Sequence, residues 1–151
     1  MKVLSAVVLA LWVMAFFRTL LNLALVPRLR AGAPTQGPLV SVLIPARNEA
    51  LTIERTVLAF FAQHYSAIEI IVVDDRSTDG TGAILDALAA THPSLTVIRG
   101  VETPSGWLGK TWALHQAAAQ ARGEALLFVD ADVVYGPDAV AAAVAYLQGS
   151  G

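Results

Sequence analysis

The chain has 151 residues, of which 56% are apolar and 15% are charged, and it contains no cysteine. A disulfide-stabilised secreted module, a zinc finger and a thiol enzyme are therefore excluded, and the low charge also excludes intrinsic disorder. Residues 1–30 hold four basic and no acidic residues, whereas residues 31–151 hold six basic and twelve acidic ones, and such an acidic body argues against nucleic acid as a partner.

The first predicted element is a membrane-spanning helix within residues 1–30. Val3–Phe17 is apolar except for Ser5, but a helix of 15 residues measures only about 22 Å, less than the ~30 Å hydrocarbon core of a bilayer. Continuing the helix to Val26 gives 24 residues and about 36 Å. This extension includes Arg18 and Asn22, and the apolar residues on both sides offset the cost of inserting the arginine.

A cleaved signal peptide and the buried helix of a soluble domain are the two alternatives to an anchor. Lys2 followed by an apolar stretch is the layout of a signal peptide, but the best cleavage candidate, Ala31–Ala33, lies 14 residues beyond that stretch. The stretch also has no polar face, which disfavours a soluble helix. Because three arginines at its C-terminal side outnumber Lys2, the positive-inside rule places the body in the cytoplasm. We predict an uncleaved anchor in the cell (inner or plasma) membrane.

The rest of the chain predicts a Gly- and Pro-containing linker at 31–38 and one α/β domain at 39–151. We expect strands at 39–44, 68–73, 95–98 and 125–129, the first of them ended by Pro45, and helices at 50–64, 81–90, 110–121 and 137–147. Alternation of helices with wholly apolar strands is typical of a parallel sheet covered on both faces. Ligands bind such sheets at the carboxyl ends of the strands, so the residues that follow each strand are the site candidates.

Two carboxylates, Asp130 and Asp132, follow the fourth strand. Residues two apart in extended chain point to the same side, about 6–7 Å apart, so both carboxylates can share a divalent cation directly or through water. Mg²⁺ takes one or two carboxylates together with substrate phosphates and keeps several waters. The alternative is that Asp132 only caps the next turn or helix. We favour the metal site because the strand before it is wholly apolar.

Polar residues also follow the first and second strands. The second strand ends in Asp74 and Asp75, one of which can accept hydrogen bonds from a base N–H or a ribose hydroxyl. Ser77–Asp79 are expected to cap the helix that follows. Three strand ends therefore bring polar groups to one edge of the sheet.

Lys110 lies in Gly106–Thr111, at the predicted start of the third helix, in a segment that nearly matches a P-loop. Pro104 stands where the first P-loop glycine is required, and proline has no N–H to bind phosphate. The 20 residues from Lys110 to Asp130 also leave little room for the elements between, so a P-loop-like NTPase is the less favoured function. At a helix N-terminus, a lysine and the helix dipole together favour a diphosphate, while a surface lysine without function is the alternative.

Together these segments resemble the family 2 glycosyltransferases, which have a GT-A nucleotide-diphospho-sugar-binding fold with a Rossmann-like, mostly parallel sheet. The resemblance is carried by residues 40–49, 72–81, 109–115 and 128–133, and residues 106–113 resemble the membrane-bound branch associated with hopanoid and carotenoid biosynthesis. In that family the strand-two aspartates contact base and ribose, and the lysine approaches the diphosphate. The donor-binding residues so implied are Pro45, Ala46, Arg47, Asn48, Glu49, Asp74, Asp75, Lys110 and Asp130, and the metal ligands are Asp130 and Asp132.

The resemblance implies a Mg²⁺- or Mn²⁺-dependent, inverting transfer of sugar from a nucleotide-diphospho-sugar, with a UDP-sugar expected as donor. The predicted anchor favours a lipid or polyisoprenoid-type acceptor. Inverting transfer needs a carboxylate base to deprotonate the acceptor hydroxyl, and after Asp132 the chain offers only Asp138, at a predicted helix start. We therefore expect the base beyond Gly151, with this chain as the donor-binding half of an enzyme. A catalytically inactive, sugar-nucleotide-binding fragment is the alternative.

Overall fold

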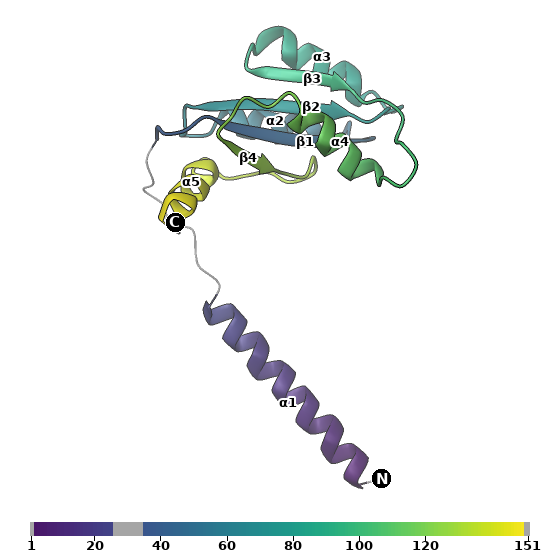
Figure 1. The fold of residues 1–151 in the computed structure, drawn as a ribbon, viewed down its shortest axis with the longest axis vertical. Coiled ribbons are helices and arrows are strands. Elements are labelled where there is room, and N and C mark those ends of the chain that lie inside the picture. Colours follow the sequence, from purple (N-terminus) through teal and green to yellow (C-terminus); the bar gives the residue numbers. More distant parts are fainter. Residues whose placement is uncertain (1, 26–34, 150–151) are drawn as a thin grey trace. The chain divides into compact units, whose positions relative to one another are not determined.

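The computed structural model describes residues 2–25 and 35–149. Val26, where the predicted anchor ends, and residues 31–34 of the predicted linker lie outside these described residues. The chain separates into two compact units, residues 1–30 and residues 31–151 (Figure 1).

The described part of the first unit is one helix, α1 (Lys2–Leu25), of 24 residues. Many of its residues are leucine and alanine, which favour helices. The segment Leu4–Leu25 is long and apolar enough to cross a membrane, and none of that span is buried. It therefore differs from the core helix of a soluble domain. Length and composition do not separate an anchor from a signal sequence, so the anchor stays a prediction.

The second unit is built on a four-stranded sheet with the order β3-β2-β1-β4, in which every neighbouring pair is parallel (Figure 1). Strand β1 lies in the middle, and its residue Val40 pairs with Ile68 of β2 on one side and with Ala125 of β4 on the other. The predicted parallel α/β sheet is thus confirmed. The four strands are β1 (Val40–Ala46), β2 (Ile68–Asp74), β3 (Leu95–Arg99) and β4 (Ala125–Phe128).

Helices cover both faces of this sheet, because successive strand residues point to opposite sides. On one face, α2, α3 and α5 pack in one cluster with Val42 and Ile44 of β1. On the other face, α4 packs on Leu43 through Ala113 and Ala117, whose small side chains let the helix approach closely. The helices are α2 (Ile53–Phe61), α3 (Thr81–Thr91), α4 (Gly109–Ala118) and α5 (Ala139–Gly149).

The order of the strands creates a crevice at one position. The chain moves from β1 to β2 to β3 in one direction, with α2 and α3 on one face, and then crosses by α4 to β4 on the other side of β1. The loops that leave β1 and β4 therefore diverge, and such a switch point is where open α/β sheets bind ligands.

Strand β1 does not end before Pro45, as the sequence predicted, but continues to Ala46. The carbonyl of Ala46 accepts a hydrogen bond from the backbone N–H of Asp75. The backbone polar groups of Ala46 therefore point toward β2, and those of Pro45 point toward the side of β4. Pairing with β4 has already ended at Leu43 and Phe128. The missing N–H of Pro45 therefore breaks no bond of the ladder. The helices predicted at 50–64 and 110–121 are shorter in the structure.

Candidate functional site

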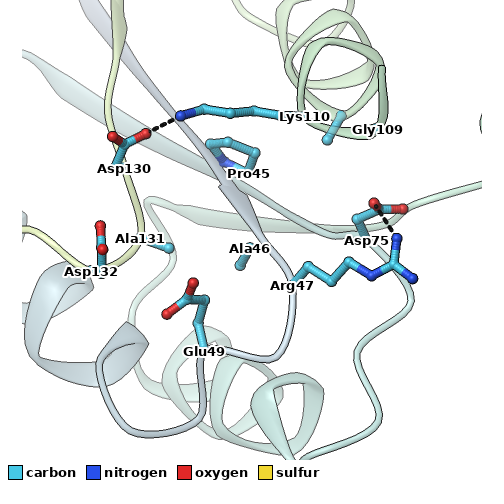
Figure 2. A pocket seen from close by; sticks show the side chains of 11 residues that line it. Pro45, Ala46, Arg47, Glu49, Asp75, Gly109, Lys110, Asp130, Ala131 and Asp132 are labelled. Atoms are coloured by element: carbon cyan, nitrogen blue, oxygen red, sulfur yellow. Dashed lines mark hydrogen bonds and ion pairs between the residues drawn. The ribbon is translucent and has the colours of Figure 1, made fainter. Parts of the chain in front are cut away.

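A pocket of about 360 Å³ lies at the carboxyl ends of β1 and β4, at the switch point of the sheet (Figure 2). Its walls come from the loops after β1, β2 and β4 and from the start of α4. It brings together all of the site residues predicted from the sequence except Asn48 and Asp74. The lining residues are Pro45, Ala46, Arg47, Glu49, Asp75, Gly109, Lys110, Ala113, Asp130, Ala131 and Asp132.

Lys110 reaches across the pocket from α4, and its Nζ donates a hydrogen bond to Asp130 Oδ1 at the end of β4 (Figure 2). Both side chains are more than half exposed. The hydrogen bond to Asp130 and the charge of that carboxylate raise the pKa of Lys110 above its usual value, so the ammonium group is charged at neutral pH. An exposed pair of this kind contributes little to stability and is easily exchanged for other partners.

A hydrogen bond from α2 fixes the backbone between the two predicted metal ligands. Thr56 of α2 donates its hydroxyl to the carbonyl of Ala131, at 2.8 Å in a buried position. Asp130 and Asp132 on either side of Ala131 both line the pocket. Asp132 accepts no hydrogen bond from any residue that the structure describes, so nothing in that part of the chain supports the capping alternative.

Glu49 is the third carboxylate on this side of the pocket, and Figure 2 shows it pointing into the space near Asp132. Its Oε2 accepts a hydrogen bond of 2.8 Å from the hydroxyl of Thr52, just before α2. Within residues 2–25 and 35–149, no three acidic or histidine side chains come close enough to hold a metal ion by themselves.

Asp75 forms the opposite end of the pocket. Its side chain is only 7% exposed and lies between two arginines: Arg76 Nε donates to Oδ1 at 3.1 Å, and Arg47 Nη1 lies 3.5 Å from Oδ2. Figure 2 shows Arg47 and Asp75 together, away from Asp130 and Asp132. The pocket thus has a carboxylate with arginines at one end and carboxylates with a lysine at the other.

The structure does not bring Asp74 into the pocket. Arg99 Nη1 donates to Asp74 Oδ2 at 2.5 Å, and the backbone N–H of Ser77 donates to Oδ1 at 3.1 Å. Arg99 also forms a close ion pair with Asp86 of α3. Asp74 therefore ties β2 to β3 and to the loop that follows β2, and of the two strand-two aspartates it is Asp75 that faces the pocket.

Asn48 also lies outside the pocket lining, in a left-handed conformation with φ 58°. Its backbone N–H donates to Ser77 Oγ at 3.0 Å, and its Oδ1 accepts from the backbone N–H of Thr78 at 2.8 Å. Asparagine tolerates this conformation better than most residues, which explains the residue type without a ligand. Asn48 thus joins the loop after β1 to the loop after β2.

Two further bonds join these loops. The backbone N–H of Glu49 donates to Thr81 Oγ1 at 2.8 Å, and that of Ala50 donates to Asp79 Oδ2 at 3.0 Å. Hydrogen bonds from the Thr81 hydroxyl and from the Ala50 N–H lower the pKa of Asp79. Asp79 also accepts from the backbone N–H of Thr81, the first residue of α3. The N-cap position itself is Gly80, which has no side-chain cap hydrogen bond, so the prediction that Ser77–Asp79 cap this helix is wrong.

Sequence reasoning missed three lining residues: Ala131, between the two predicted metal ligands, and Gly109 and Ala113 of α4. The two residues of α4 share one feature of the sequence. Residues four apart lie on the same face of a helix, so their spacing would have placed them together. Neither carries a group with chemistry of its own, however, and only the packing of α4 against β1 shows which face of the helix meets the pocket.

Solved structures share this architecture. A mannosyltransferase from Pyrobaculum calidifontis, in complex with GDP-Man and Mn²⁺, has a TM-score of 0.72 and 34% identity over 89% of this chain and 39% of that one. Residues 1–349 of Staphylococcus aureus TarS, in complex with UDP-GlcNAc, give a TM-score of 0.62 and 32% identity over 74% of this chain and 31% of that one. The GT-A fold expected from the resemblance is confirmed.

Curated relatives are similar in sequence. A beta-monoglucosyldiacylglycerol synthase from Synechocystis sp. is 36% identical over 111 residues, which are 72% of this chain and 23% of that protein. A 4,4'-diaponeurosporenoate glycosyltransferase from Staphylococcus haemolyticus is 36% identical over 69% of this chain and 26% of that protein. The chain thus spans about a quarter of the length of these relatives.

The model of the family described as Glycosyl transferase family 2 matches residues 41–151, which is well over half of the chain. The match includes the whole pocket, and it favours a glycosyltransferase over a P-loop-like NTPase. The chain therefore belongs to the family 2 glycosyltransferases.

Proposed function

We propose that this chain forms the donor-binding part of a membrane-anchored, divalent-metal-dependent glycosyltransferase that moves sugar from a UDP-sugar to a lipid acceptor with inversion. The observation that carries the proposal is the pocket at the switch point, where Asp75, Lys110, Asp130 and Asp132 converge from three different parts of the sheet edge. The solved relatives that carry GDP-Man with Mn²⁺ and UDP-GlcNAc support it.

The donor set of the pocket suits a hard divalent cation. Asp130 and Asp132 offer exposed carboxylate oxygens, and two carboxylates leave coordination positions for phosphate and water, as Mg²⁺ and Mn²⁺ require. Such a cation would stabilise the negative charge that develops on the leaving nucleoside diphosphate. Asp130 and Asp132 would hold it.

Lys110 is the residue whose partner changes when the donor binds. In the structure its ammonium group neutralises Asp130. Its ammonium group, in the first turn of α4, would bind the diphosphate of the donor, since the helix dipole also favours negative charge there. Asp75 and Arg47 then face the nucleoside end of the donor.

The base that deprotonates the acceptor is not assigned to a described residue. Asp138 is the remaining carboxylate after Asp132, and its Oδ1 lies within hydrogen-bond distance, 2.9 Å, of His64 Nδ1 rather than lining the pocket. This pair holds the end of α2 to the loop before α5. We assign Asp138 no part in the transfer.

The membrane and the acceptor are inferred together. The segment Leu4–Leu25 is long and apolar enough to cross a bilayer. The three arginines of residues 18–30 favour a cytoplasmic position for the body under the positive-inside rule. A relative named as a monoglucosyldiacylglycerol synthase supports an acceptor of lipid type. A pocket tethered beside a bilayer favours acceptors that are themselves embedded in it.

The proposal is tested by calorimetric titration of the full chain in detergent with UDP-glucose and other sugar nucleotides, with and without Mn²⁺. We expect binding that requires Mn²⁺ and is lost when Asp130 and Asp132 are both changed to Ala. Asp138→Asn is the matched control, because it removes an acidic charge outside the pocket. Absence of metal-dependent binding to every sugar nucleotide would refute the proposal. Binding without transfer to any lipid acceptor would instead support the sugar-nucleotide-binding fragment.

A further inference from the structure

Helix α1 carries two polar side chains on one face near its C-terminal end. Arg18 is the only charged residue in the sequence of the candidate span Leu4–Leu25, and Asn22 follows it by four residues, which places both on the same face about one helical turn apart. Among the residues that the structure describes, neither side chain has a hydrogen-bond or ion-pair partner. The hydroxyl of Thr19, in contrast, donates to the carbonyl of Ala15 at 2.9 Å and is satisfied inside the helix. The N–H groups of Arg18 and Asn22 are therefore available to a partner from outside the helix.

Arg18 lies at a depth where the hydrocarbon of a bilayer would surround the helix. It precedes Leu25, the end of the candidate span, by seven residues, which is about 10 Å along the axis at ~1.5 Å per residue. Side chains of a helix tilt toward its N-terminus, so the side chain of Arg18 leaves the backbone in the direction away from the nearer membrane surface. A charged group inside hydrocarbon is costly unless it is paired. Arg18 therefore needs a counter-charge that comes to it.

The chemistry of this face matches a phosphate group of the bilayer. Residues 1–30 contain no acidic residue, so neither this helix nor a second copy of it can supply the counter-charge. The lipid phosphates nearest to Arg18 lie at the C-terminal end of the span. A guanidinium group binds phosphate through two parallel N–H bonds, and the amide of Asn22, one turn closer to that surface, adds N–H donors. Charge and hydrogen-bond donors thus lie along one path from the membrane surface to Arg18.

We infer that Arg18 and Asn22 form a binding site for the phosphate group of an anionic membrane lipid in the leaflet at the C-terminal end of α1. This inference rests on the membrane anchor of the proposed function, but it depends neither on the pocket nor on any nucleotide. The lipid must carry net negative charge, because a zwitterionic lipid brings its own cation to neutralise the phosphate. The site therefore favours phosphatidylglycerol over phosphatidylcholine.

The test is native mass spectrometry of the full chain in detergent with equal amounts of phosphatidylglycerol and phosphatidylcholine. The wild type should retain phosphatidylglycerol in preference. Arg18→Leu should weaken this binding about tenfold, as expected for the loss of a charge-assisted contact. Arg18→Lys should keep part of the affinity, because an ammonium group keeps the charge but not the paired donors. Asn22→Leu should weaken binding less than Arg18→Leu does.

Thr19→Val is the matched control for these variants. It removes a polar group next to Arg18 in the sequence, but the hydrogen bond of that group stays within the helix. Its preference for phosphatidylglycerol should equal that of the wild type. A loss of the preference in Thr19→Val as large as in Arg18→Leu would show that the lipid responds to the polarity of the helix in general, and it would overturn the inference.

Further measurements separate the lipid site from other causes. All variants should show the same melting of the second unit by circular dichroism, because α1 belongs to the other compact unit. An excess of inorganic phosphate should not displace the lipid, and displacement would show a site for free phosphate and overturn the inference. Equal retention of phosphatidylglycerol by the wild type and Arg18→Leu would overturn it as well.

The same samples distinguish a failure of this inference from a failure of the proposed function. If the lipid preference is absent while sugar nucleotides still bind with Mn²⁺, the inference alone is wrong. If the lipid preference is present but no sugar nucleotide binds, the inference holds and the proposed donor site is wrong. Release of the chain from membranes by alkaline carbonate would show that α1 is not an anchor, and it would overturn both the inference and the membrane part of the proposed function.

Discussion

The two ends of the sheet carry the same kinds of charged side chain in opposite settings. At the carboxyl end, Lys110 and Asp130 pair in the open, with side chains 62% and 53% exposed. At the amino end, Glu69 of β2 is 7% exposed and accepts hydrogen bonds from Ser41 Oγ at 2.5 Å and from the backbone and side chain of Arg122. The first pair can exchange partners, whereas the second cannot without leaving a buried charge unpaired.

The exposure of the side chains thus distinguishes an ion pair that is available to a ligand from a structural one better than the residue types do. The network at Glu69 continues through Ser41, whose Oγ accepts from the backbone N–H of Gly123 at 2.8 Å. It thereby fixes the turn before β4 and hence the position of that strand beside β1. The pair at Lys110 joins the start of α4 to the loop after β4 by one exposed contact, which contributes little to stability.

The largest effect should follow from breaking the buried network. Glu69→Ala leaves the Ser41 hydroxyl and the Arg122 backbone N–H without their acceptor, and we expect it to lower the free energy of unfolding by about 2–4 kcal/mol. Chemical denaturation followed by circular dichroism measures this change. Glu124→Ala, an exposed acid close to β4, is the control and should stay within about 0.5 kcal/mol of wild type. Equal stability of Glu69→Ala and the control would show that the network is dispensable.

A smaller effect should appear when acid titrates the same carboxyl. Burial raises the pKa of Glu69, but the hydrogen bonds from Ser41 and Arg122 outweigh it, and the pKa is lowered overall. A carboxyl with a lowered pKa stabilises the fold above its unfolded value of about 4.3, and this contribution is lost as the pH falls through the folded value. Wild-type stability should therefore drop below about pH 4 more steeply than that of Glu69→Gln. Parallel stability curves for the two proteins from pH 6 to pH 3 would contradict this expectation.

Breaking the exposed pair of Lys110 and Asp130 should have the smallest effect on stability and the largest effect on ligand affinity. Lys110→Met should change the free energy of unfolding by less than about 1 kcal/mol, because exposed ion pairs contribute little. Asp130 then has no competing cation, so Mn²⁺ alone should bind several-fold more tightly, while UDP in the presence of Mn²⁺ should bind about tenfold more weakly. Electron paramagnetic resonance of free Mn²⁺ measures the first change and calorimetry the second. Lys110→Arg keeps the charge, and its affinities for Mn²⁺ and UDP should lie between those of the wild type and Lys110→Met. Unchanged Mn²⁺ affinity in Lys110→Met would show that the lysine and the metal do not compete.

The parallel sheet was predictable because its strands are mostly apolar and alternate with helices. The pocket was predictable in outline because parallel strands bring Asp75 and Asp130 to one edge. The choice between Asp74 and Asp75 was not, since neighbouring strand residues point to opposite sides and the partner of Asp74, Arg99, lies on another strand.

The bonds between the loops after β1 and β2 bear on the thermodynamics of donor binding. Asn48, Glu49 and Ala50 are held by side chains of the other loop in the absence of any ligand. One wall of the pocket is therefore already ordered, and a donor that binds there does not have to supply the conformational entropy of arranging it. The opposite wall must first give up the contact between Lys110 and Asp130. Under the proposed function, the cost of rearranging the pocket would therefore arise at the phosphate end of the donor, while the wall formed by the loops after β1 and β2 would need no rearrangement.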